Sequence, residues 1–233
     1  LEQDFNRLSA FSTDIAHELR TPISNLMTQT QVALAQQRNA AEYRDILASN
    51  AEEFQRLART VSDMLFLAKA ENIRSLPNPE SIELADEVNS LLEFYEALAE
   101  EKRITFRLNG EGTMTGDRLM VRRAVSNLLS NALRHAEAGS TITVRIAAEA
   151  DQVSVAVSNQ GEPIDPAVVP RLFDRFFRAD RSRHQADAEG AGLGLPIVAA
   201  IMGAHGGTAG IQSSGRITEV TLVFPAHVRA DQA

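Results

Sequence analysis

Hydrophobic residues near the start of the chain recur at alternating intervals of four and three positions, the spacing of one packed helix face. This spacing predicts a long helix over residues 2–36, with a change of direction near Pro22. Its apolar positions are Leu1, Phe5, Leu8, Ile15, Leu19 and Leu26. A tight connection over residues 37–39 then leads to a second long helix over residues 40–71.

The second helix keeps the same heptad spacing, with one polar exception. Its apolar positions are Tyr43, Leu47, Phe54, Leu57, Val61, Met64 and Ala68. The exception is Asn50, and the sequence allows two readings of it. If its amide is buried, it helps to set the register of the packed helices; if it is solvated, it has no such role. Two amphipathic helices alone bury too little apolar surface to be stable, so we expect two copies of the chain to form a four-helix bundle.

Two prolines in Leu76-Pro77-Asn78-Pro79 interrupt the helical pattern and indicate a domain boundary. We expect a helical domain over residues 1–75 and a second domain over residues 76–233. The second domain is predicted to contain helices over residues 84–102, 117–135, 171–177 and 193–205, strands over residues 103–108, 141–148, 152–158, 208–213 and 218–224, and loops over residues 109–116 and 179–189. The strands at 141–148 and 152–158 are expected to form a hairpin. This mixed order predicts an α+β sandwich.

Composition narrows the class of protein. The 233 residues are 44% hydrophobic and 23% charged, which is typical of a soluble globular protein. The absence of cysteine excludes disulfides, thiolate metal sites and cysteine catalysis. A net charge of −8 argues against a nucleic-acid partner. No apolar run is long enough to span a membrane, no signal peptide is present, and a start at Leu1 in mid-heptad indicates a fragment.

His17 lies about 180° from the apolar face of the first helix. Thr21 follows it by one turn and Asp14 precedes it by about one turn, on the same side. An exposed helical histidine is more often a solvated residue than a reactive one. Pro22, however, costs a helix interior about 3 kcal/mol, and such a cost beside His17 and Glu18 indicates a working site. A neutral imidazole is a good nucleophile near neutral pH, and a neighbouring carboxylate can hold its tautomer.

This part of the helix resembles the phosphoacceptor box of sensor histidine kinases, with the string H-E-L-R-T-P preceded by F-x-x-D-I-A. The resemblance implies that His17 is the phosphorylated residue and that Glu18 is the base that polarises it. It also implies that Thr21 positions water for the reverse, phosphatase reaction. The continuation over residues 23–30 is most similar to kinases that sense copper, silver or other heavy metals.

Two carboxamides, those of Asn127 and Asn131, stand one turn apart on one face of a predicted helix. Amide oxygens suit Mg²⁺, which keeps several waters and binds substrate phosphates. Such a pair alone is weak evidence, but with its flanking apolar residues it resembles the N-box of the histidine-kinase ATP-binding fold. The resemblance implies a site for ATP and Mg²⁺, and Arg134 and His135 could reach the same phosphates.

A glycine-rich run, G-A-G-L-G-L-P, occupies residues 190–196 directly before the last predicted helix. Glycines let a backbone approach a polyphosphate, and the amides of a helix N-terminus favour its charge. The run lacks the βαβ context of a dinucleotide-binding fingerprint and the Lys-Ser/Thr of a P-loop. It resembles the second glycine box of histidine kinases, which implies nucleotide contacts from Gly190, Gly192, Leu193 and Gly194.

Two further motifs separate the N-box from this run. Residues 172–177, L-F-D-R-F-F, resemble the family's F-box, although plain core aromatics would read the same. Arginines on the expected lid loop could contact phosphates or remain solvated; they are Arg178, Arg181 and Arg183. Residues 157–164 align with the first glycine box of the family, and Gly161 is one of its glycines. The chain departs from that box at two positions: Asn159 stands where an adenine-binding Asp is usual, and Pro163 replaces the second glycine. An amide oxygen still accepts a hydrogen bond from the adenine amino group, so we expect an adenine site of altered affinity and selectivity.

These motifs, in the family's order, cover nearly the whole chain. We interpret it as the cytoplasmic catalytic portion of a dimeric sensor histidine kinase: a helical hairpin that forms a dimeric four-helix bundle, then an ATP-binding sandwich of the histidine-kinase, gyrase and Hsp90 type. ATP would phosphorylate His17, and the phosphoryl group would pass to an aspartate in the receiver domain of a response regulator. The parent protein is expected in the bacterial inner membrane. Two alternatives stay open: an ATPase or serine kinase of the same fold, and a non-enzymatic dimerisation module with a decayed nucleotide pocket.

Overall fold

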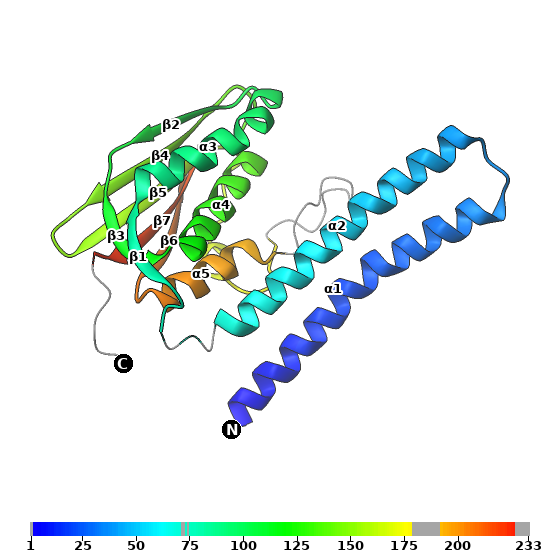
Figure 1. Cartoon of the computed structure of the whole chain (residues 1–233), viewed down its shortest axis with the longest axis horizontal. Helices are drawn as coiled ribbons and strands as arrows, with labels where there is room; N and C mark the ends of the chain where they lie inside the picture. The colour runs from blue at the N-terminus through cyan, green and yellow to red at the C-terminus, as the bar shows by residue number, and fades with distance from the viewer. Residues whose placement is uncertain (1, 71–72, 74, 179–191, 227–233) are drawn as a thin grey trace. The chain divides into compact units, whose positions relative to one another are not determined.

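The computed structural model describes residues 2–70, 73, 75–178 and 192–226, and the side chains within these ranges from residue 13 onward, except 14 and 17 (Figure 1). The chain divides into two compact units near residue 66, and each is described by itself. The boundary predicted between residues 75 and 76 remains a prediction. None of the described helices is long and apolar enough to cross a membrane.

The first unit is the predicted helical hairpin, formed by α1 (Glu2–Ala35) and α2 (Ala40–Ala70). α1 stays helical through Pro22. At the turn, the Asn39 side chain accepts a hydrogen bond from the Glu42 backbone N–H at 2.9 Å, and the Glu42 carboxylate accepts one from the Asn39 N–H at 3.1 Å. This reciprocal cap satisfies donors that a helix N-terminus leaves open, and it fixes where α2 begins.

The inner face of the hairpin is apolar apart from one amide. Leu26, Ala33 and Met64 are buried there, and Asn50 is buried with them at 8% exposure. Of the two readings of Asn50 that the sequence allows, the buried one is therefore correct. Several large apolar side chains of the two helices stay exposed within a single chain, namely Ile23, Met27, Val32, Leu34, Leu47, Phe54, Val61 and Leu65. A hairpin with this much exposed apolar surface fits a core that is completed by a second copy.

The second unit is a five-stranded sheet covered on one face by helices, which confirms the predicted α+β sandwich. The strands lie in the spatial order β2 (Thr105–Asn109), β4 (Thr141–Ala148), β5 (Gln152–Gln160), β7 (Ile217–Pro225) and β6 (Thr208–Ser214). Neighbouring strands are antiparallel, except β2 and β4, which are parallel. The covering helices are α3 (Leu84–Glu101), α4 (Arg118–His135) and α5 (Gly194–Ala204) (Figure 1).

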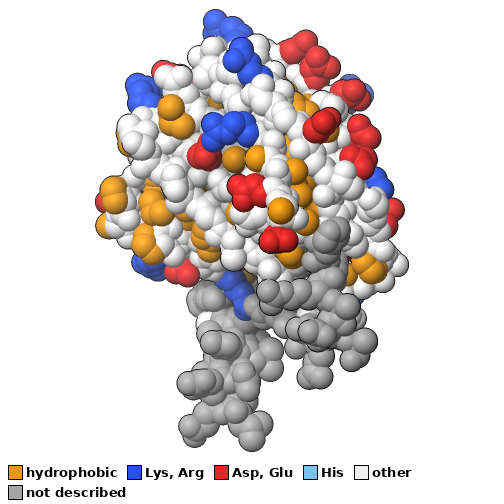
Figure 2. All heavy atoms as spheres, turned by 90° about the vertical axis from the view of Figure 1, so that its left-hand side faces the viewer, with side chains coloured by type: hydrophobic (Ala, Val, Ile, Leu, Met, Phe, Trp, Pro, Cys, Tyr) orange, Lys and Arg blue, Asp and Glu red, His pale blue; other side chains and the backbone are white. Residues whose placement is uncertain are grey.

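Alternation along the strands creates the core of this unit. Ile142, Val144 and Ile146 of β4 are buried towards the helices, whereas Thr141 and Arg145 are exposed on the opposite face. The helices complete the core with apolar residues, among them Ala124, Leu128, Leu129, Leu133, Ile197 and Ile201. On the face shown in Figure 2, acidic, basic and apolar side chains are all exposed.

Some local predictions are wrong. Residues 109–116 were expected to be a loop, but β3 (Thr113–Asp117) begins there and pairs with β1 (Pro79–Glu83). Both strands are short and carry one buried apolar residue each, Ile82 and Met114, so their sequence shows little alternation. The helix expected over residues 171–177 is only a 3-10 turn, Val169–Arg171, followed by further turns. Phe176 has a φ of 60°, which no right-handed helix accommodates. The loop expected over residues 179–189 lies outside the described residues.

Candidate functional site

The asparagine pair of α4 lies directly beneath the first residue of α5. A Cβ atom placed on Gly194 would be 3.7 Å from Asn131 Nδ2 and 3.8 Å from Asn127 Oδ1. The Asn127 Nδ2 atom is buried and has no hydrogen-bond partner within the described residues. A buried donor without a partner is costly, so this amide is suited to bind a polar ligand. The backbone N–H groups at the start of α5 add partial positive charge at the same place, which favours an anion.

The described end of the glycine run therefore lies against the asparagine pair at Gly194. Gly192 and Leu193 lead directly into α5, and Leu193 is buried. Gly190 lies outside the described residues, as do Arg181 and Arg183. Arg134 and His135 are exposed at the C-terminal end of α4, one turn beyond Asn131.

A second cluster forms where β5 ends against the end of α4. Gly161 pairs with Ala136 in a short antiparallel bridge, and the Glu137 N–H donates to the Gln160 carbonyl at 2.7 Å. A Cβ atom on Gly161 would lie 3.3 Å from Asn159 Nδ2. Asn159 is 92% buried on the helix-facing side of β5, in register with Thr218 of β7. The structure thus places the amide of Asn159 beside the helix that carries the asparagine pair.

The sequence reading misses two hydroxyl groups at this end of the sheet, that of Thr218, opposite Asn159, and that of Ser213, opposite Thr218. Thr218 Oγ1 and Ser213 Oγ lie 3.3 Å apart, and Ser213 Oγ accepts a hydrogen bond from the Ile164 backbone N–H at 3.3 Å. Their position along the strands could reveal them. In the alternation of each strand, Ser213 and Thr218 fall on the side that faces the helices, where most other residues are apolar. Together with Asn159, they make this end of the helix-facing side of the sheet polar. The hydrogen bond from Ile164 to Ser213 also attaches the loop after Gly161 to the sheet.

The F-box aromatics are half-buried in the turns over residues 172–177, and they are neither fully core nor exposed. The Arg171 guanidinium lies 4.4 Å from the centre of the Phe177 ring. Arg178, the last residue described in this part of the chain, is exposed. The half-buried position of the aromatics fits an F-box and plain core packing alike, so the F-box resemblance stays a prediction.

The phosphoacceptor string lies within α1. The backbones of His17, Glu18 and Thr21 are all helical, and the side chains of Glu18 and Thr21 are exposed. The side chain of His17 lies outside the described part of the chain. Thr21 follows His17 by slightly more than one turn, so the helix places both on one side.

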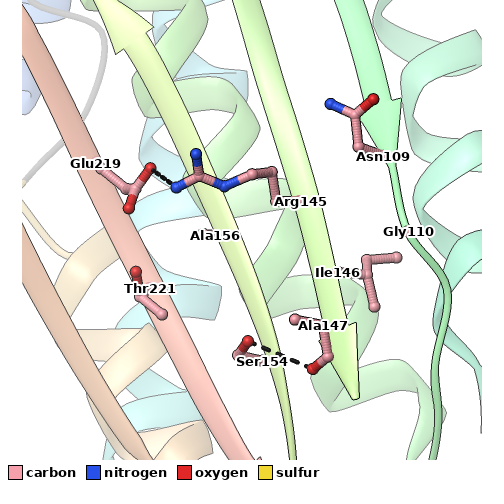
Figure 3. A pocket seen from close by; sticks show the side chains of 9 residues that line it. All are labelled: Asn109, Gly110, Arg145, Ile146, Ala147, Ser154, Ala156, Glu219 and Thr221. Carbon is pink, nitrogen blue, oxygen red and sulfur yellow. Dashed lines mark hydrogen bonds and ion pairs between the residues drawn. The ribbon is translucent and has the colours of Figure 1, made fainter. Parts of the chain in front are cut away.

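A hollow among the described residues lies elsewhere, on the sheet face away from the helices (Figure 3). It is a shallow depression of about 320 Å³ lined by Asn109, Gly110, Arg145, Ile146, Ala147, Ser154, Ala156, Glu219 and Thr221. Small side chains such as Ala156 form its floor, and an ion pair between Arg145 and Glu219 crosses it. Its two charged groups neutralise each other, whereas the asparagine pair keeps an unused donor. The asparagine pair is therefore the better candidate for a ligand site.

Two family models match the chain. Residues 7–73 match the "His Kinase A (phospho-acceptor) domain", and residues 116–228 match the "Histidine kinase-, DNA gyrase B-, and HSP90-like ATPase". The sensor histidine kinase CusS of Escherichia coli K12 is 51% identical over 227 residues, which are 97% of this chain and 47% of that protein. The probable sensor protein PcoS of Escherichia coli is 48% identical over 231 residues, which are 99% of this chain and 48% of that protein. The chain thus spans about half the length of the curated relatives it matches.

Solved structures share the fold at lower sequence identity. The histidine kinase AdeS of Acinetobacter baumannii superimposes with a TM-score of 0.74 at 22% identity, over 90% of this chain and 98% of that one. The histidine kinase ThkA, in its complex with the response regulator protein TrrA, gives a TM-score of 0.77 at 18% identity, over 97% of this chain and 64% of that one. At these identities the likeness concerns the fold alone.

Proposed function

Because this chain belongs to the sensor histidine kinases, we propose that it binds ATP between the asparagine pair and α5, phosphorylates its own His17, and passes the phosphoryl group to a response-regulator aspartate. The proposal rests on one observation: the side chains of Asn127 and Asn131 lie next to Gly194, the first residue of α5. Amide oxygens, an unpartnered buried amide donor and helix N-terminal N–H groups together suit a metal-bound polyphosphate. The same chain carries the His-Glu pair on α1.

The residues present fit Mg²⁺. The Asn131 and Asn127 side-chain oxygens would hold the ion together with water and the nucleotide phosphates, which is the mixed coordination that Mg²⁺ prefers. When bound, the ion neutralises phosphate charge. Arg134 and His135, exposed at the end of the same helix, would contact the phosphates, as would Gly190, Gly192, Leu193 and Gly194 through the backbone.

The transfer reaction needs little covalent chemistry from the protein. One ring nitrogen of neutral His17 forms a bond to the γ-phosphorus while the bond to the bridging oxygen breaks, and ADP leaves with that electron pair. The other ring nitrogen keeps its proton, and the Glu18 carboxylate stabilises the positive charge that develops on the ring. Catalysis then consists mainly of positioning and charge stabilisation. In the reverse direction, Thr21 would position water against the phosphorylated regulator.

The adenine end of the site would be formed by Asn159, with Gly161 and Thr218 beside it. The Asn159 amide would accept a hydrogen bond from the adenine amino group. We also propose that the chain works as a homodimer within a longer, membrane-anchored bacterial sensor of heavy metals. The relatives are sensor proteins about twice its length, and the string over residues 23–30 resembles that of heavy-metal sensors.

The test is incubation of the chain with γ-labelled ATP and Mg²⁺. We expect label on the wild type that is lost in acid and survives base, as a phosphoramidate does. His17→Gln should incorporate no label yet bind nucleotide with unchanged affinity, because Asn127, Asn131 and Asn159 all lie in the other unit. His227→Gln, the same change at a histidine outside the motifs, should be labelled normally. Base-labile label, or label on His17→Gln, would contradict the proposal.

A further inference from the structure

His205, the residue directly after α5, is buried at 4% exposure and bonded at both ring nitrogens. Its Nδ1 atom lies 2.8 Å from the Ile201 carbonyl oxygen, and a carbonyl can only accept, so Nδ1 carries the proton. Its Nε2 atom accepts a hydrogen bond from the Asp117 backbone N–H at 3.1 Å. Both bonds together require the neutral ring in one tautomer.

The group at the other end of this bond is the N-terminus of α4. Asp117 caps that helix: one carboxylate oxygen accepts from the Met120 N–H at 3.0 Å and the other accepts from the Asn78 N–H at 3.3 Å. Gly116, just before it, leaves room for the imidazole, since a Cβ atom there would lie 2.9 Å from His205 Nε2. The Phe224 ring of β7 contacts the imidazole edge-on, with 5.7 Å between ring centres.

The His205–Asp117 bond and the candidate nucleotide site lie at opposite ends of the same helix pair. α5 spans eleven residues between its contact with the asparagine pair, at Gly194, and its contact with Asp117, at His205. At 1.5 Å per residue this is about 16 Å, and the ten residues from Asp117 to Asn127 along α4 span about 15 Å. The two helices are therefore antiparallel and matched in length between their two contacts.

Between these contacts, the packing of α5 within the described part of the chain is apolar. Pro196, Ile197, Val198, Ile201 and Met202 are buried. Apolar burial is not directional, whereas a hydrogen bond fixes a distance and an angle. A small axial shift of α5 would move Gly194 and the backbone amides beside it by the same amount relative to Asn127 and Asn131. Misplacement of about 1 Å is enough to weaken catalysis strongly.

We infer that His205 is a positioning residue for nucleotide binding. As a neutral acceptor for the Asp117 N–H, it fixes the axial position of α5 against α4. It thereby places Gly194 and the adjacent backbone amides over Asn127 and Asn131. The inference rests on the proposed function. Protonation of the ring would place an N–H against the Asp117 N–H and break the bond. Nucleotide affinity should therefore depend on the charge of a residue that does not touch the nucleotide.

The electrostatics favour the neutral ring at physiological pH. Burial lowers the pKa of His205 below its usual value, against smaller opposing effects of the hydrogen bond to Ile201 and the negative charge of Asp117. Among the described residues, Asp117 is the one charged group that acts on it. Since the folded state binds the proton less readily than the open state, the contact is complete at the usual pKa of histidine and is lost only as the pH falls through the lowered pKa of the folded state.

The experiment compares Mg²⁺-ADP binding and ATP kinetics in the wild type, His205→Leu and His205→Gln, from pH 7.5 to pH 5.5. The leucine removes the acceptor, and we expect about tenfold weaker ADP binding with a raised KM for ATP. The glutamine keeps a neutral acceptor at the Nε2 position, and we expect affinity within about threefold of the wild type at pH 7.5. As the pH falls, the wild type should lose affinity relative to the glutamine variant. This ratio cancels the titration of the nucleotide phosphates.

Ile146→Val, a change in the core of β4 away from α5, is the control for global destabilisation and should bind ADP normally. If His205→Leu does not fold, the pH dependence of the ADP affinity of the wild type relative to His205→Gln still tests the inference. Equal affinity in folded His205→Leu, or an unchanging ratio with pH, overturns the inference while leaving the kinase proposal intact. If the wild type binds no nucleotide, the kinase proposal is wrong, and the inference, which rests on it, is wrong as well.

Discussion

A Cβ atom on Gly161 would lie 2.2 Å from the carbonyl oxygen of His135. This approach is closer than any side chain allows, and it brings the end of β5 onto the end of α4. The Gly161 N–H also donates to the Arg216 carbonyl at 2.8 Å, so the backbone cannot retreat without losing a hydrogen bond. One glycine thus joins the strand that carries Asn159 to the helix that carries the asparagine pair.

Gly161→Ala should therefore destabilise the second unit by roughly 1–3 kcal/mol, the usual cost of overpacking, and weaken nucleotide binding. Denaturant unfolding followed by circular dichroism gives the first value, and ADP titration gives the second. Gly210→Ala is the matched control, because a Cβ atom on that glycine of β6 meets nothing within 4 Å. Equal stabilities of the two variants would show that the loop yields freely.

The elements with a strong hydrophobic period could be predicted from the sequence: both helices of the hairpin, α3, α4, α5 and the strands of the main sheet. The β1–β3 pair could not, because each strand has a single buried apolar residue and its pairing joins segments about 35 residues apart. The same limit applies to the site. Asn127, Asn131 and Asn159 carry recognisable motifs. The contacts of Thr218 with Asn159, of Ser213 with Ile164 and of His205 with Asp117 instead join segments far apart in the chain.

Thr21→Ala should keep autophosphorylation and impair dephosphorylation of the partner regulator. Thr21 is exposed one turn beyond His17, so its hydroxyl is placed to orient water without touching the transfer from ATP. The measurement is the lifetime of the phosphorylated regulator with each kinase form, and Thr28→Ala, another exposed threonine of α1, serves as the control. Equal lifetimes would remove Thr21 from the mechanism.

Asn131→Ala should abolish the Mg²⁺-dependent part of nucleotide binding and stop autophosphorylation, because it removes an oxygen ligand while leaving the apolar side of α4 unchanged. Titration with ADP in Mg²⁺ and in a chelator separates the two parts of the binding. Asn89→Ala, at an exposed asparagine of α3, should behave as wild type. Loss of folding in Asn131→Ala would instead indicate a structural role.

Asn50→Leu should raise the thermal midpoint of the helical unit. The Asn50 Nδ2 atom donates to Thr30 Oγ1 over a long 3.4 Å, and the Oδ1 atom is buried without a partner in the described chain. A buried unsatisfied polar atom costs about 1–3 kcal/mol, and leucine removes it while filling the same space. In a bundle of two copies, the amide would restrict the helices to one register. Exchange between differently tagged copies should therefore become less selective in the variant. A lower thermal midpoint would mean that the second copy or a water molecule satisfies Oδ1.

Asn159→Asp should sharpen the preference for ATP over GTP. An aspartate would accept from the adenine amino group through a charge-assisted bond, roughly twice as strong as a neutral one, and would repel the guanine carbonyl oxygen. The wild-type amide has no charge and can turn to donate to that oxygen instead. We therefore expect modest ATP affinity in the wild type and an ATP-over-GTP preference smaller by on the order of 1 kcal/mol or more than in the variant. Competition binding of the two nucleotides to both proteins measures this difference, and Asn89→Asp controls for the added charge. The Thr218 hydroxyl decides the outcome, together with the Ser213 hydroxyl 3.3 Å from it, since Thr218 stands opposite Asn159 in the sheet. A wild type that rejects GTP as sharply as Asn159→Asp would mean that these hydroxyls lock the amide with its oxygen towards the base.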